Sequence, residues 1–179
     1  MMTTFYTVDR AAALGCPNPL AAGMIIYPTE GFSHLGPQTS ANLSALLPGD
    51  YSRHGKRYLI EDLPMTSHAG HPMEIILELL RQRDYPTKPS RLKSAFGCLD
   101  VASAKAFRNL NPAYAKSPIF EIEPAHQSAH IADMNLLNIS CPAHEYLNKC
   151  HLYWQGQPGP SPFWEAVIPL PANIGEQVA

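Results

Sequence analysis

The hydrophobic residues of this chain fall into short runs that are separated by glycine and proline. Alternating apolar positions predict β-strands at residues 5–8, 24–27, 118–123 and 164–170, a further extended segment at 130–137, and a possible strand at 57–63. Helical spacing predicts helices at 72–84 and 142–154, each opening with a proline. Their expected buried residues are Ile75, Ile76, Leu79 and Leu80 in the first helix, and Tyr146, Leu147, Cys150 and Trp154 in the second.

Residues 89–111 combine both kinds of pattern. An apolar run at 94–99 predicts a strand, Asp100 is a favourable helix N-cap, and Val101, Ala104, Phe107 and Leu110 then share one helical face. The segment is therefore expected to form a strand, a tight turn and a helix. Ser94 and Phe96 lie on the strand and Phe107 on the helix, so the two rings are suited to hold a flat ligand ring between them.

The remaining segments suggest a loop-rich protein of the α+β class. Residues 29–52 are rich in glycine, proline, serine and asparagine, which predicts a long loop that covers a ligand. The basic segment at 52–57 fits either a solvated turn or a phosphate contact. Helices that occur irregularly among short strands indicate an α+β fold.

Composition narrows the classes of protein to consider. With 179 residues, 45% hydrophobic and 16% charged, the chain is expected to form a single globular domain, residues 1–179. Its net charge of −2 offers no general attraction for nucleic acid, and its apolar runs are too short to span a bilayer. No signal peptide is visible and the four cysteines are scattered, so we expect reduced thiols and a cytoplasmic location, or delivery into a target cell's cytoplasm without a classical signal.

Several histidine and cysteine pairs have spacings that a zinc site uses. They are His68 with His71, His126 with His130, and the set of Cys141, His144, Cys150 and His151, in which Cys141 with His144 is the best pair. Eight histidines make chance pairs common in a chain of this length, and no CxxC motif is present. We therefore predict no metal, although a zinc-dependent hydrolase stays among the alternatives.

Glu165 is the one charged residue of the predicted strand at 164–170. A carboxylate at the mouth of a buried apolar run must be paired, hydrogen-bonded or functional. Glu165 is therefore a candidate for chemistry.

The segment from Ser94 to Phe107 resembles a motif of the ADP-ribosyltransferase fold in its diphtheria toxin and poly(ADP-ribose) polymerase branch. There, a strand that carries an aromatic residue is followed by a small-residue turn, an aspartate and an alanine-rich helix with a second aromatic residue eleven positions on, as Phe96 and Phe107 are here. The strand that begins around Glu165 resembles the family's catalytic-glutamate strand. The chain has phenylalanine for both of the branch's tyrosines.

The first strand takes the place of the family's first motif, with Tyr6 and Thr7 where the branch usually has histidine. The arginine-serine-glutamate branch of the same fold is an alternative frame. In that frame, the three positions are Arg10, Ser94 and Glu165.

This resemblance implies a fold of split mixed or antiparallel β-sheets with a few short helices. It also implies an NAD-dependent mono-ADP-ribosyltransferase, such as a toxin-like bacterial or phage effector, with NAD as substrate and a protein or nucleic acid as acceptor. A catalytically inactive interaction module on the same fold is the alternative, and an unrelated α+β domain is also open.

The resemblance assigns roles to individual residues. Glu165 would stabilise the oxocarbenium-like centre that forms as nicotinamide leaves. Ser94 would bind the ribose or hold Glu165. The implied NAD-binding residues are Tyr6, Thr7, Arg10, Arg91, Phe96 and Phe107, with the two phenylalanines around the nicotinamide and Arg10 or Arg91 at the diphosphate.

Overall fold

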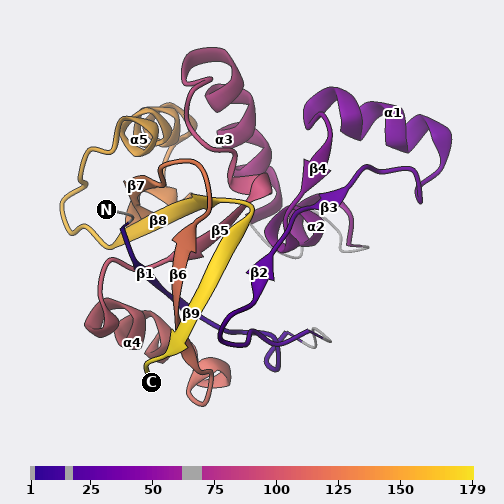
Figure 1. The fold of residues 1–179 in the computed structure, drawn as a ribbon. Coiled ribbons are helices and arrows are strands. Elements are labelled where there is room, and N and C mark those ends of the chain that lie inside the picture. Colours follow the sequence, from indigo (N-terminus) through magenta and orange to yellow (C-terminus); the bar gives the residue numbers. More distant parts are fainter. Residues whose placement is uncertain (1–2, 15–17, 62–69) are drawn as a thin grey trace.

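A computed structural model describes residues 3–14, 18–61 and 70–179 of the chain (Figure 1). Its strands form two main antiparallel sheets and one small hairpin. The first sheet has the order β1 (Phe5–Val8), β6 (Ile119–Pro124), β9 (Ala172–Gln177), β2 (Ile25–Ile26). The second has the order β5 (Ser94–Gly97), β8 (Trp164–Pro169), β7 (His130–Asp133), and the hairpin pairs β3 (Thr29–Glu30) with β4 (Asp50–Tyr51). The α+β class that the sequence predicts is confirmed.

The two main sheets meet where β1 passes the end of β5. Tyr6 N donates to Cys98 O at 2.9 Å, and Cys98 N donates to Tyr6 O at 2.7 Å. Gly97 lies beside this bridge, and a Cβ atom there would stand 3.0 Å from Phe5 Cβ and 3.2 Å from Ile168 Cδ1. A glycine is therefore what lets the backbones of the two sheets come this close.

Helices cover the sheets on separate sides. The α-helices are α1 (Pro37–Leu46), α2 (Arg53–Leu59), α3 (Gly70–Asp84), α4 (Val101–Asn109) and α5 (Ala143–Gln155), and the short 3₁₀ helices are η2 (Arg91–Lys93), η3 (Pro112–Tyr114) and η4 (Met134–Leu137). In Figure 1, α3 and α5 lie above the β5-β8-β7 sheet, α4 lies below near β1, and α1 projects to the right with the β3–β4 hairpin. Leu77 of α3, Trp154 of α5 and Val167 of β8 share one buried apolar cluster, which joins the upper helices to their sheet.

The strand, turn and helix predicted around Asp100 are confirmed. The Asp100 side chain accepts a hydrogen bond from Ser103 N at 2.7 Å, which caps α4. The strands predicted at 5–8, 118–123 and 164–170 and the helices at 72–84 and 142–154 are also confirmed to within a few residues. Of the predicted strand at 24–27, only Ile25–Ile26 pairs as a strand. Of the extended segment predicted at 130–137, the first half forms β7 and the second half forms η4.

Two predictions from the pattern were wrong, and one strand was missed. Residues 29–52 are not one loop, because they contain β3, α1 and β4. α1 buries no residue, so it lacks the apolar stripe from which a helix is predicted. The expected strand at 57–63 is replaced by α2 over its first residues, and residues 62–63 lie outside the described part. β9, with Gly175 and a polar end, was missed.

The buried face of α3 differs from the predicted one. Leu79 is 52% exposed, whereas Glu74 and Glu78 are each 1% exposed. In α5, likewise, Leu147 is exposed and Tyr153 is fully buried in its place. The glutamates of α3 are buried because each binds an arginine, which the apolar pattern alone does not reveal.

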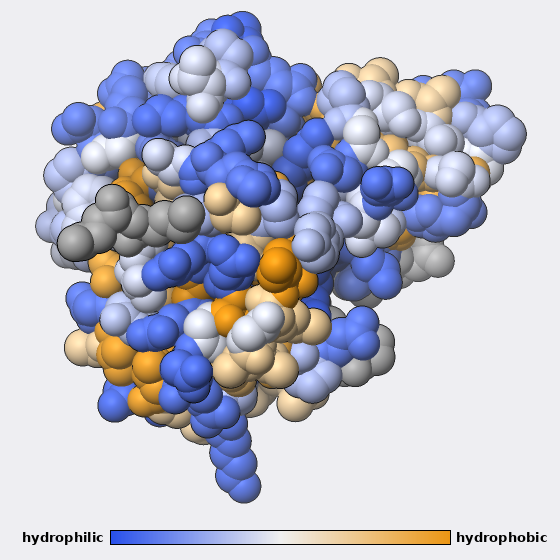
Figure 2. Space-filling model, in the orientation of Figure 1, coloured by the Kyte–Doolittle hydropathy of each residue, from blue (hydrophilic) through white to orange (hydrophobic). Residues whose placement is uncertain are grey.

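Apolar side chains are also exposed near β2. Met24 and Ile25 are 37% and 44% exposed, and Figure 2 shows hydrophobic surface on this face of the molecule in the region of β2 and β9. β2 is an edge strand of two residues, so little unpaired backbone accompanies this surface. Within the described residues, no helix is long and apolar enough to cross a membrane.

Candidate active site

Six side chains form a largely buried ionic and aromatic cluster on the side of the β5-β8-β7 sheet that faces α3 and α5. We refer to it as the Arg91 cluster, and its members are His54, Glu74, Arg91, Phe96, Tyr153 and Glu165. Three of these residues, Arg91, Phe96 and Glu165, were singled out from the sequence. The other three come from α2, α3 and α5.

Arg91 is 5% exposed and binds two carboxylates. Its Nε donates to both oxygens of Glu74 at 3.1 and 3.0 Å, and its Nη2 donates to Glu74 Oε1 at 2.9 Å. Its Nη1 donates to Glu165 Oε1 at 2.6 Å. The forked guanidinium therefore connects α3 to the beginning of strand β8.

Glu165 is held through only one of its oxygens. Tyr153 accepts a hydrogen bond from Arg91 Nη1 and donates its own hydroxyl to Glu165 Oε1 at 2.8 Å. Among the described residues, none donates a hydrogen bond to Glu165 Oε2. Glu165 as a whole is 7% exposed. The contacts at Oε1 therefore fix the position of Oε2, which has no hydrogen-bond partner among the described residues.

Burial and charge together fix the protonation of the cluster. Burial alone would raise the pKa of Glu74, but the neighbouring Arg91 and His54 outweigh it and bring this pKa to about 2. Burial would lower the pKa of Arg91, but Glu165 and Glu74 raise it well above its ordinary value. Burial raises the pKa of Tyr153 well above its ordinary value, so its hydroxyl stays a hydrogen-bond donor.

Two aromatic rings form the edge of the cluster. Arg91 Cζ lies 4.6 Å from the centroid of the Phe96 ring, in cation–π geometry. The centroid of the His54 ring lies 4.6 Å from the ring centroid of Phe96 and 4.6 Å from that of Tyr58. Phe96 faces Val167 across the β5–β8 pair, and therefore shares a face of the sheet with Glu165, two residues before Val167.

A close backbone approach places His54 beside the cluster. Ser52 Oγ accepts from Gly55 N at 3.2 Å, which caps α2, and donates to Leu92 O at 3.1 Å. A Cβ atom on Gly55 would lie 2.2 Å from Leu92 O, so only glycine allows α2 to dock on η2 at this distance.

Ser94 supports the turn that carries Arg91. Its Oγ donates to Ser90 O at 2.7 Å, and Ser90 Oγ donates to Glu78 Oε2 at 2.8 Å. One of the predicted roles of Ser94 was to hold Glu165. In the structure, Tyr153 and Arg91 hold Glu165 instead. Arg91 is likewise bound to carboxylates here rather than free for a diphosphate.

The other predicted binding residues form a second group beside β1 and α4. Arg10 Cζ lies 5.6 Å from the ring centroid of Phe107 and 5.7 Å from that of Tyr114, and Tyr6 and Phe107 pack against one apolar cluster. We call Tyr6, Arg10, Phe107 and Tyr114 the Arg10 group. Thr7 alternates with Tyr6 and so points to the opposite side of β1.

Cys98 lies between the Arg91 cluster and the Arg10 group. It belongs to the apolar cluster against which Tyr6 and Phe107 pack. Burial, and then the charge of Glu165, raise the pKa of its thiol to about 12. The two sets of predicted residues are therefore neighbours, but Phe96 contacts Arg91 and His54 while Phe107 contacts Arg10, so the described rings do not stack on each other.

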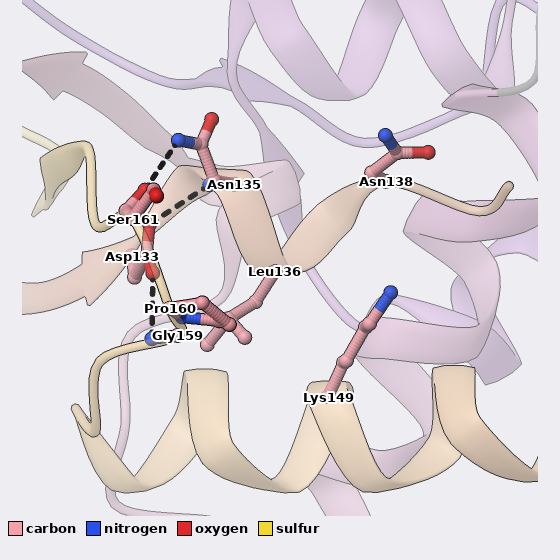
Figure 3. A pocket seen from close by; sticks show the side chains of 8 residues that line it. All are labelled: Asp133, Asn135, Leu136, Asn138, Lys149, Gly159, Pro160 and Ser161. Atoms are coloured by element: carbon pink, nitrogen blue, oxygen red, sulfur yellow. Dashed lines mark hydrogen bonds between the residues drawn. The ribbon is translucent and has the colours of Figure 1, made fainter. Parts of the chain in front are cut away.

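A pocket of about 250 Å³ lies apart from the predicted site residues (Figure 3). Its lining residues are Asp133, Asn135, Leu136, Asn138, Lys149, Gly159, Pro160 and Ser161. Asp133 is fully buried and accepts from the backbone N–H groups of Asn135, Gly159 and Phe163. Its carboxylate thus holds together the loop before β8, which accounts for the polar side of this pocket.

No group of three or more histidine, cysteine, aspartate or glutamate side chains within residues 3–14, 18–61 and 70–179 is arranged to hold a metal ion. Of the pairs noted in the sequence, His68 lies outside the described residues. His130 instead lies 3.0 Å from Tyr153 O through its Nε2 and stacks on Trp154.

Sequence reasoning missed His54, Glu74 and Tyr153. His54 lies in the basic segment at 52–57, which fitted a solvated turn or a phosphate contact, and Glu74 was not singled out. The available signal was the spacing of Glu74, Leu77 and Glu78, which places both acids on the same helical face as a leucine. Tyr153 directly precedes Trp154, one of the predicted buried residues, and its role depends on contacts that only the fold reveals.

Comparison with known proteins places the chain in a family without assigning it an activity. A search of curated proteins finds no match. A family model described as "Protein of unknown function (DUF2441)" matches residues 52–178, which include the whole Arg91 cluster but not Tyr6, Thr7 or Arg10. Because this match covers well over half of the sequence, the chain belongs to the DUF2441 family.

Proposed function

We propose that the chain is an NAD-dependent mono-ADP-ribosyltransferase in which Glu165 is the catalytic carboxylate, acting on a protein or nucleic-acid acceptor. The observation that carries the proposal is the asymmetry of Glu165. Arg91 and Tyr153 hold Oε1, while Oε2 accepts no hydrogen bond from the described residues.

This asymmetry suits the chemistry of the reaction. Cleavage of the bond between nicotinamide and ribose develops positive charge on the sugar, as glycoside cleavage does. A carboxylate that is fixed in advance and accepts a hydrogen bond from a ribose hydroxyl stabilises this charge without reorganising. Oε2 of Glu165 supplies the acceptor, and the two contacts at Oε1 supply the rigidity.

The surroundings of Glu165 support the same proposal. Phe96 lies on the same face of the sheet and is only partly buried, so its ring can stack against nicotinamide. Arg10 is partly exposed and lies over two aromatic rings, which leaves its guanidinium as the candidate for the diphosphate. Two antiparallel sheets joined by the bridge between Tyr6 and Cys98 are consistent with the split-sheet architecture that the resemblance implies.

One observation favours the alternative of an inactive binding module on the same fold. The guanidinium of Arg91 contacts Glu165 directly, at 2.6 Å, and offsets part of the negative charge that the reaction needs. In that alternative the Arg91 cluster holds α3, α5 and β8 together and performs no reaction.

Nicotinamide release from NAD tests the proposal. We expect the unaltered protein to release nicotinamide, and Glu165→Gln to lower the rate by at least about 100-fold because the anionic acceptor is lost. Glu176→Gln, a matched change at an exposed residue of β9, is the control and should leave the rate unchanged. Circular dichroism and thermal unfolding of each variant verify that it is folded.

One result would contradict the role of Glu165, and another would contradict the enzyme assignment. Release that continues at the original rate in folded Glu165→Gln removes Glu165 from the mechanism. NAD binding by calorimetry without any release identifies the inactive module instead.

A further inference from the structure

His54 and Glu74 form a pair of imidazole and carboxylate for which the proposed mechanism has no task so far. His54 Nε2 lies 2.8 Å from Glu74 Oε1, close enough for an ion pair although the ring N–H is not aligned as in a good hydrogen bond. The side chain of Glu74 is 1% exposed, whereas that of His54 is 14% exposed. The pair therefore has a buried acidic end and a partly accessible basic end.

The two nitrogens of the His54 ring have different surroundings. Nε2 faces the carboxylate, while Nδ1 has no hydrogen-bond partner among the described residues. A carboxylate behind one ring nitrogen favours the proton on that nitrogen and leaves a lone pair on the other. Glu74 remains ionised because its pKa is about 2, so this preference holds at neutral pH.

His54 and Glu165 are both close to the same aromatic ring. The His54 ring lies 4.6 Å from Phe96, and Arg91, which binds Glu165, lies 4.6 Å from Phe96 as well. Arg91 also binds Glu74, the partner of His54. One guanidinium thus connects the two acids, and a ligand stacked on Phe96 would have both His54 and Glu165 as neighbours.

We propose that His54 is the general base of the transfer, and that the acceptor is a neutral protic group, either a hydroxyl or water, that must lose its proton to react. This inference rests on the proposed function. An already ionised acceptor, such as a carboxylate, would need no base. A partly accessible imidazole backed by a buried carboxylate fits the first kind of acceptor and has no use for the second.

The step balances in atoms and electrons. The bond between ribose C1 and the nicotinamide nitrogen breaks, and its electron pair leaves with neutral nicotinamide. A bond forms between ribose C1 and the acceptor oxygen, whose proton moves to His54 Nδ1. The carboxylate of Glu74 then faces the resulting imidazolium and offsets its charge.

Other charged groups lie on the elements packed against α2. They are His71 and Glu74 of α3, Arg91 and Lys93 of η2, and Asp50 and Tyr51 of β4, together with Tyr58 on α2 itself. Of these, Tyr58 and Glu74 contact the imidazole ring, and Arg91 is connected to it through Glu74. Lys93 pairs with Asp50, which leaves Glu74 as the anion beside His54.

Single-turnover release of nicotinamide from NAD, with water as the acceptor, tests the inference. We expect His54→Ala to slow release by about 100-fold with little change in NAD affinity, because a positioned base contributes at least that much. Added imidazole should restore part of the rate, since the variant leaves a ring-sized space beside Phe96 and Tyr58. The rate in the unaltered protein should rise with pH, because the base acts in its neutral form, and this rise should disappear in the variant.

Two further variants keep the test decisive. His54→Gln preserves bulk and polarity without a base of comparable strength, so it should be as slow as His54→Ala and serves if the alanine variant does not fold. His144→Ala removes an exposed histidine of α5 and should release nicotinamide at the original rate.

The outcomes separate this inference from the proposed function. Unchanged release in either folded His54 variant, alongside loss in Glu165→Gln, overturns the base and leaves the enzyme assignment intact. A slow variant that imidazole does not rescue and that keeps the original pH dependence also overturns it, because His54 is then structural. Absence of release from the unaltered protein contradicts both proposals.

Discussion

At the scale of single residues, the buried charges are stable only as a set. Arg91 has its donors shared between Glu74 and Glu165, and Tyr153 uses its hydroxyl both to accept and to donate. Removing one member of a buried ionic set leaves the others desolvated without a partner, which costs more than an exposed ion pair contributes. The Arg91 cluster therefore fixes the relative positions of η2, α3, α5 and β8 while it also prepares Glu165.

Acid should destabilise the protein in part through Glu74. The pKa of Glu74 is about 2 in the folded chain, below the ordinary value of 4.5, so the folded state favours its ionised form. This contribution is present above about pH 4.5 and is lost as the pH falls towards 2. Urea unfolding should show that Glu74→Gln lowers the free energy of unfolding by on the order of 3 kcal/mol at pH 7, and by much less at pH 3.

The exposed Glu176 provides the comparison for this experiment. Glu176→Gln should leave the free energy of unfolding nearly unchanged at either pH, because a solvated carboxylate gains little from folding. An equal effect of Glu74→Gln at pH 7 and pH 3 would show that its role is packing rather than charge.

Glu165 was recognisable in the sequence by its own chemistry, whereas its connection to Glu74 was not. Glu165 interrupts an apolar strand, and that contrast is visible in a one-dimensional pattern. Glu74 lies 91 positions before Glu165 in the sequence. It belongs to a helix whose apolar residues are numerous enough to explain why the helix is buried. A partner that is close only in space, through Arg91, leaves no local signal.

At the scale of elements, α2 depends on its N-cap residue, Ser52, more than on an apolar face. Its seven residues include three arginine or lysine residues and His54, and Gly55 is its one buried residue among those described. Ser52 caps the helix and also donates to Leu92 O in η2. This explains why the pattern predicted a turn and a strand here, since capping and backbone docking are invisible to hydrophobic periodicity.

Ser52→Ala should therefore destabilise the protein and loosen the position of His54. The variant loses a cap and a buried hydrogen bond, so we expect the free energy of unfolding in urea to fall by about 1–2 kcal/mol. Ser44→Ala, a change in the exposed face of α1, should have an effect close to zero or slightly stabilising. Equal stability of the two variants would contradict the role of Ser52 as a buried cap.

At the scale of the whole molecule, the candidate site depends on how the two sheets meet. The resemblance used three segments far apart in the sequence, and the structure places β5 beside β8 and β1 beside the end of β5. The order of strands was not predictable from the pattern, because strand pairing depends on long-range contacts that alternation does not encode. The individual strands were predictable, since each has an apolar side to bury.

Gly97 is where this arrangement can be tested. An added methyl group would lie 3.0 Å from Phe5 Cβ of the first sheet, and 3.2 Å from Ile168 Cδ1 of the second. Phe5 Cβ is attached directly to the backbone and yields only if its strand shifts, and the fully buried Ile168 side chain has little room to rotate away. Gly97→Ala should therefore lower the free energy of unfolding by about 1–3 kcal/mol, measured by urea denaturation.

Gly36, where an added Cβ meets no atom within 4 Å, provides the control. Gly36→Ser adds a side chain at the N-cap of α1, where serine is favourable, and should change the free energy of unfolding by less than about 0.5 kcal/mol. If Gly97→Ala is as stable as Gly36→Ser, the sheets are not held in close contact at this point. The position of Glu165 near Cys98 would then need another explanation. That position follows from two contacts, the pairing of β5 with β8 and the bridge from Cys98, directly after β5, to Tyr6 of β1.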